Sequence, residues 1–127
     1  GCMIYGKVRN SVLFPGVTVE EGAVVENSIV MSNSFISSGS RIDHCILSED
    51  VKVGKNVVIG EGENIPNKLR PQIYNTGITV VGEGAQIPDG AIIGKNVEID
   101  MYADESDFCS HKVPSGFSVL KGGEYDD

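Results

Sequence analysis

Residues 10–60 consist of one 17-residue unit written three times, and this repeat constrains the fold more than any other feature of the chain. The copies are residues 10–26, 27–43 and 44–60, and equivalent columns of the three copies hold equivalent aliphatic residues. An internal repeat of this kind means that each copy is one structural unit that stacks on the next.

Aliphatic residues recur every five or six positions, and the same spacing returns after a gap. A small or compact residue stands two positions before each of them. Neither a helical period of 3.6 nor simple strand alternation gives this spacing. It predicts short parallel strands wound as a solenoid, with three hexads per triangular coil, large residues inside and small residues at the corners. The predicted inward residues are Met3, Val8, Leu13, Val19, Val25, Val30, Ile36, Ile42, Leu47, Val53, Ile59, Val81, Ile87, Ile93 and Ile99.

This pattern is the hexapeptide repeat of an all-β, parallel β-helix. We expect the β-helix over residues 1–100, with residues 61–77 extruded as a loop because they contain two prolines and break the hexads. Residues 101–127 leave the pattern; we expect a tail that can form one last strand over 117–120 and ends in disorder. A β-sandwich is disfavoured because its strands alternate at period two.

Composition excludes several classes of function. The formal net charge is −8 and the pI is near 4.6, so the chain lacks the basic surface of a nucleic-acid-binding or membrane-surface protein. No apolar run approaches the ~20 residues that cross a bilayer, and no signal peptide is visible. The cysteines, Cys2, Cys45 and Cys109, show no CxxC spacing, which favours free thiols in a reducing compartment.

Candidate chemistry is sparse. Hexapeptide β-helices include acyltransferases that use a histidine base at a coil corner, at a subunit interface, and His44 is the candidate here. Its counterparts in the other copies are Asn10 and Asn27, which favours a turn residue over a catalytic base. A three-histidine metal site is not expected, because the only other histidine, His111, lies in the tail. We therefore predict no catalytic, cofactor or metal residues in this chain.

Two segments are more specific than the repeat itself: SVLFPGV, from Ser11, and GITVVGEGAQIPDGAIIG, from Gly77. With them, roughly residues 1–100 resemble the C-terminal domain of bacterial glucose-1-phosphate adenylyltransferase, also called ADP-glucose pyrophosphorylase. The resemblance implies that the β-helix is left-handed, which the spacing alone does not show. In that family an N-terminal nucleotidyltransferase domain joins ATP and glucose 1-phosphate into ADP-glucose and pyrophosphate for glycogen synthesis.

The resemblance implies a non-catalytic regulatory and oligomerisation domain in a cytoplasmic enzyme. Its partners would be the N-terminal catalytic domain of the same protein, further subunits, most simply of a tetramer, and an anionic sugar-phosphate effector. The Mg²⁺ that accompanies ATP would belong to the catalytic domain. Lys68 and Arg70, which share the 61–77 loop, are the candidate effector or interface residues, chosen from their loop position alone.

Two alternatives stay open on the sequence. One is a free-standing hexapeptide acyltransferase that uses His44. The other is a domain of a related sugar-phosphate nucleotidyltransferase, or of a non-catalytic subunit of the glycogen enzyme.

Overall fold

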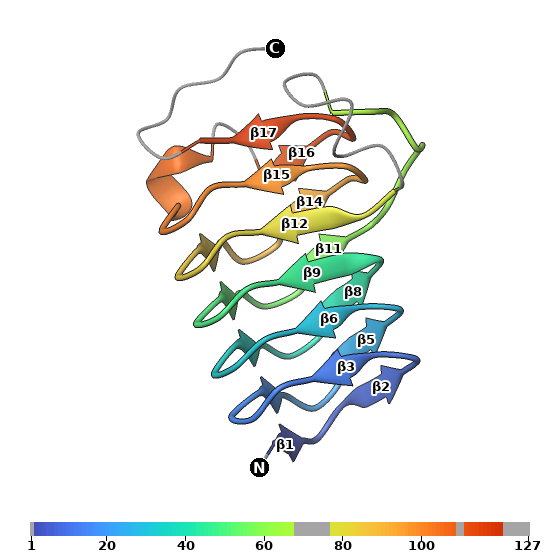
Figure 1. The fold of residues 1–127 in the computed structure, drawn as a ribbon, viewed down its shortest axis with the longest axis vertical. Helices are drawn as coiled ribbons and strands as arrows, with labels where there is room; N and C mark the ends of the chain where they lie inside the picture. The colour runs from blue at the N-terminus through green and yellow to red at the C-terminus, as the bar shows by residue number, and fades with distance from the viewer. Residues whose placement is uncertain (1, 68–76, 109–110, 121–127) are drawn as a thin grey trace.

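The chain folds into a stack of triangular coils of short parallel strands (Figure 1). The structure is a computed structural model and describes residues 2–67, 77–108 and 111–120. Each strand pairs with the equivalent strand of the neighbouring coil, as Thr18 does with Phe35, 17 residues later. The stack runs from the N-terminal coil, blue in Figure 1, to the coil that carries β17. The predicted all-β parallel solenoid is confirmed.

Three parallel sheets form the sides of the triangle. Sheet A contains β1 (Met3–Ile4), β4 (Thr18–Val19), β7 (Phe35–Ile36), β10 (Lys52–Val53) and β13 (Gln86–Ile87). Sheet B contains β2 (Lys7–Arg9), β5 (Val24–Glu26), β8 (Arg41–Asp43), β11 (Val58–Ile59), β14 (Ile92–Ile93) and β16 (Lys112–Val113). Sheet C contains β3 (Val12–Leu13), β6 (Ile29–Val30), β9 (Cys45–Leu47), β12 (Thr79–Val81), β15 (Glu98–Ile99) and β17 (Ser118–Val119).

The inward side chains form one aliphatic column along the axis of the stack. Ile36, for example, is fully buried between Val19 and Val53 of the adjacent coils, as the hexad spacing predicts. The six-residue period therefore reports which residue of each short strand points inward. The fully or almost fully buried members of the predicted series are Val19, Val25, Val30, Ile36, Ile42, Leu47, Val53, Ile59, Val81, Ile87, Ile93 and Ile99.

The prediction that the Met3 side chain points inward is wrong. Met3 pairs with the outward Thr18 and is 56% exposed, whereas its neighbour Ile4 pairs with the inward Val19. The cause is a short first corner: two residues, Tyr5 and Gly6, join the strands that four residues join in the next coil. A β-carbon at Gly6 would lie within van der Waals overlap of the Ala23 carbonyl oxygen, so this tight corner requires glycine.

Buried hydroxyl groups join neighbouring coils at the corners. The Ser34 Oγ donates to the Ser48 carbonyl oxygen (2.8 Å) and accepts from the Val51 N–H (3.2 Å), so one side chain satisfies two backbone groups. Ser28, Ser40 and Thr79 do the same at their corners. Where the small residue two positions before an inward aliphatic residue is Ser or Thr, it therefore fits the tight corner and also hydrogen-bonds the backbone.

The coils continue beyond Asp100, where we expected the regular hexads to stop. β16 pairs with β14, and β17, within the predicted terminal strand, pairs with β15. On the third side of this last coil a 3-10 turn, η1 (Glu105–Asp107), replaces a strand, and the Ala103 carbonyl oxygen accepts from Gln86 N–H at the end of sheet A (2.7 Å). The tail expected to be disordered, residues 121–127, lies outside the described residues.

Candidate functional site

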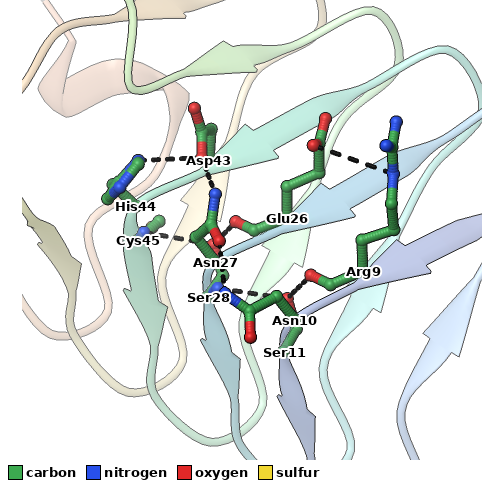
Figure 2. A network of polar contacts seen from close by, with 9 residues as sticks. All are labelled: Arg9, Asn10, Ser11, Glu26, Asn27, Ser28, Asp43, His44 and Cys45. Carbon is green, nitrogen blue, oxygen red and sulfur yellow. Dashed lines mark hydrogen bonds and ion pairs between the residues drawn. The ribbon is translucent and has the colours of Figure 1, made fainter.

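The corner between sheets B and C carries a row of polar side chains that contact one another from coil to coil (Figure 2). Asn10, Asn27 and His44 occupy equivalent positions in successive coils, and each has a φ of 49°, in the left-handed region. Asparagine tolerates this conformation better than most residues with a β-carbon. The backbone geometry therefore explains why asparagine recurs at this point of the repeat, and His44 shares that geometry.

The side chains at this corner are hydrogen-bonded from coil to coil. Asn10 Nδ2 donates to Asn27 Oδ1 (2.7 Å), and Asn27 Nδ2 donates to Asp43 Oδ1 (3.2 Å). The Asp43 carboxylate also lies 2.8 Å from His44 Nδ1 (Figure 2). We call this row, Asn10, Asn27, Asp43 and His44, the corner ladder.

His44 occupies the same left-handed turn position as Asn10 and Asn27 of the preceding coils. Both His44 and Asp43 are about half exposed, so the pair sits on an open corner and not in a recess that excludes water. A histidine base needs a substrate held against its free nitrogen; Asp43, together with Arg41 and Glu61, lines an open depression of about 380 Å³ beside this corner. His111, also exposed, lies in the last coil.

The part of the chain that the structure describes contains no group of three or more His, Cys, Asp or Glu side chains close enough to hold a metal ion. The 61–65 segment and strands β14 and β16 line an open depression of about 360 Å³. Its polar lining consists of Glu61, Glu63, Lys112 and Ser115, a mixture that has neither a nucleophile–base pair nor a single sign of charge.

Sheet C has an apolar outer face over its first four coils. The outward residues Val12, Ile29, Ile46 and Val80 lie in one row across neighbouring strands. Val12 is 56% exposed and Ile29 is 36% exposed. Farther along the same row the outward residue is Glu98. We call Val12, Ile29, Ile46 and Val80 the apolar row; Ile46 and Val80 are partly buried. Exposed apolar surface such as that of Val12 and Ile29 is typical of contact with another protein surface.

The two predicted loop cations, Lys68 and Arg70, lie outside the described residues. The described flanks of their loop are anchored by Asn67 and Asn96, both fully buried, which the sequence analysis did not single out. Asn64 and Asn67 are visible in the sequence as loop residues, but Asn96, to which both bond, lies 32 and 29 residues farther along the chain. No helix in the described part of the chain has the length and hydrophobicity needed to cross a membrane.

Fold and repeat together define a hexapeptide-repeat β-helix, and comparison with known families agrees. Residues 1–81 match the family described as GlmU-like, C-terminal hexapeptide, and the chain belongs to this family.

Among named proteins, the chain is 62% identical over 98% of its length to a glucose-1-phosphate adenylyltransferase of Acetivibrio thermocellus, and 53% identical over 97% to that of Ruminiclostridium cellulolyticum. It spans only 29% of the length of either relative. The matched part corresponds to their C-terminal domain, as the sequence resemblance indicated.

A solved structure shares the fold at low identity. The acetyltransferase domain of PglB from Neisseria gonorrhoeae, in complex with acetyl coenzyme A, superposes with a TM-score of 0.64 over 92% of this chain and 53% of that one. The two sequences are 18% identical, so this likeness supports the β-helix architecture alone.

Proposed function

We propose that this chain is the non-catalytic C-terminal domain of a glucose-1-phosphate adenylyltransferase, an enzyme that converts ATP and glucose 1-phosphate into ADP-glucose and pyrophosphate for glycogen synthesis. The observation that carries the proposal is the 62% identity over 98% of the chain to an adenylyltransferase of which it spans 29%. Under this proposal the nucleotide, the sugar phosphate and the accompanying Mg²⁺ bind in the rest of the protein.

The alternative of a free-standing acyltransferase is not favoured. Its one candidate base, His44, shares the left-handed backbone of Asn10 and Asn27 and continues their ladder. That role explains the histidine without any catalytic function.

The β-helix would serve the longer protein as a docking and assembly surface. We propose that the apolar row packs against the catalytic part of the same protein, because the relatives have more than two thirds of their length outside the matched region. Further contacts between copies would build an oligomer, most simply a tetramer. The proposal that the domain takes part in binding an anionic sugar-phosphate effector rests on Lys68 and Arg70. The proposal that the protein is cytoplasmic rests on the enzyme class.

The first experiment is an activity assay on the purified 127-residue chain. With ATP, glucose 1-phosphate and Mg²⁺ we expect no pyrophosphate above the blank, and with acetyl coenzyme A no release of free thiol. Acetyl coenzyme A turnover that disappears in His44→Ala would overturn the proposal in favour of an acyltransferase. Pyrophosphate formation by this chain would show that it carries an adenylyltransferase site itself.

The apolar row is tested in the full-length protein. We expect Ile29→Glu to weaken the association of the β-helix with the rest of the protein, measured as faster proteolysis between the two parts. Val24→Glu is the matched control, since Val24 is an outward aliphatic residue of the same coil but on sheet B. Equal proteolysis of the two variants would exclude the apolar row as the docking surface.

A further inference from the structure

Two asparagines, Asn67 and Asn96, are fully buried near the last two coils. A buried amide destabilises the folded state unless its donors and acceptor find partners. Asn96 has a φ of 56°, like the corner asparagines, but Asn10 and Asn27 are exposed. Asn96 differs because residues 64–67 cover it, and its amide bonds to that covering segment.

The Asn96 side chain bonds residues on both sides of segment 68–76. Its Nδ2 donates to the Asn64 Oδ1 (2.5 Å) and to the Ile65 carbonyl oxygen (2.8 Å). Its Oδ1 accepts from the Gly77 N–H (2.7 Å). One side chain of the fifth coil therefore fixes the place where the chain leaves the β-helix and the place where it returns.

Asn67 extends the same contacts to the last coil. Its Nδ2 lies within hydrogen-bond distance of the Asn96 carbonyl oxygen (2.9 Å), the Phe117 carbonyl oxygen (3.2 Å) and the Ser118 Oγ (3.2 Å). Backbone packing is equally close here, because a β-carbon on Gly116 would lie 2.7 Å from the Pro66 carbonyl oxygen. We call Asn64, Asn67, Asn96 and Ser118 the amide cluster.

We propose that the amide cluster couples segment 61–67 to the last coil, residues 111–120, so that the two dock and open as one unit. Lifting either segment alone would leave buried amide groups and backbone carbonyls without partners. That loss favours opening of both segments together. If the proposed function holds, a ligand or subunit that binds one segment then changes the stability of the other by the same coupling free energy.

Amide hydrogen exchange on the 127-residue chain tests the coupling. The N–H groups of Gly94 and Asp100 report docking of the last coil, because they donate to the Val113 and Val119 carbonyl oxygens. The Gly77 N–H reports the loop anchor. In Asn67→Ala we expect exchange at all three amides to accelerate by a similar factor, about tenfold or more, since several buried hydrogen bonds are lost together.

Ser34→Ala is the matched control, because Ser34 is equally buried and bridges two coils far from the cluster. It should leave Gly77, Gly94 and Asp100 unchanged. Should Asn67→Ala fail to fold, Ser118→Ala makes the same test with a smaller loss, and acceleration at Gly77 as well as Asp100 is again expected. Faster exchange at Gly77 alone, or at Gly94 and Asp100 alone, in the variant that folds would overturn the proposal.

Discussion

Ile36 shows what a single inward residue contributes to this fold. Its side chain is fully buried and stacks between Val19 and Val53, so each coil depends on the aliphatic residues of the coils above and below. Lys52, next to Val53 on β10, points outward and is exposed. The two residues of one short strand thus lie on opposite sides, one buried and one exposed. Substitutions at the two positions should therefore differ in their effect on stability.

For Ile36→Asp we expect a loss of about 4 kcal/mol in the free energy of unfolding, because an unpaired charge enters the aliphatic column. Lys52→Ala should change it by less than about 0.5 kcal/mol, since no buried contact is lost. Urea unfolding followed by circular dichroism measures both. If the two variants unfold at the same urea concentration, the inward assignment of Ile36 is wrong.

Among the described residues, Cys45 is the one whose shifted pKa predicts a pH dependence of stability. Burial raises the pKa of the Cys45 thiol far above its ordinary value of 9.0. Below pH 9 the thiol is protonated in both the folded and the unfolded chain and has no effect. Above pH 9 only the unfolded chain loses the proton, so the free energy of unfolding should fall by up to about 1.4 kcal/mol per pH unit.

Urea unfolding of wild type and Cys45→Ser from pH 8 to pH 10.5 isolates this effect from the other titrating groups. The difference between the two proteins should change in favour of the variant as the pH rises above 9. A difference that stays constant across this range would show that the Cys45 thiol is accessible to ionisation in the folded protein.

Among structural elements, the corners repeat as faithfully as the strands. The corner between sheets B and C uses Asn10, Asn27 and His44 in the left-handed conformation. Asn10 donates to Asn27, and Asp43 accepts from Asn27 and pairs with His44. A residue at such a corner is selected for its backbone preference first and for its side-chain partner second. An asparagine should therefore replace a structural histidine at this corner without loss of stability, and this can be measured.

We expect His44→Asn to leave the free energy of unfolding within about 0.5 kcal/mol of wild type, because asparagine accepts the same φ. His44→Ala should lose about 1 kcal/mol or more, since alanine has neither the preference nor a hydrogen bond to Asp43. Thermal unfolding compares the two. A His44→Asn protein as unstable as His44→Ala would mean that the imidazole itself is required at this corner.

The elements also show where sequence reasoning succeeds and where it stops. The positions of Ile36 and Val53 follow from the hexad period, because the period directly reflects side-chain direction. Met3 was misassigned because it neighbours another aliphatic residue, and the shortened corner at Gly6 leaves no signal in composition. The amide cluster could not be predicted, because Asn67 and Asn96 meet through the folded stack and no local pattern pairs residues so far apart.

At the scale of the whole molecule, the chain is a stack with two different ends. The first coil exposes Met3, Ile4 and Tyr5, whereas the aliphatic residues Val113 and Val119 of the last coil are buried. In a stack of this kind stability is approximately a sum of coil terms and neighbour terms. A segment that bonds to two coils at once, as 61–67 does, adds coupling beyond nearest neighbours at the C-terminal end.

Whether this β-helix is the non-catalytic end of an adenylyltransferase is tested most directly on the complete product of the gene that encodes it. The measurement is ADP-glucose formation from ATP and glucose 1-phosphate in the presence of Mg²⁺, with the complete product and the 127-residue chain assayed side by side. We expect the complete product to form ADP-glucose and the chain alone to form none. A complete product without this activity, or ADP-glucose formation by the chain alone, would contradict the proposed function.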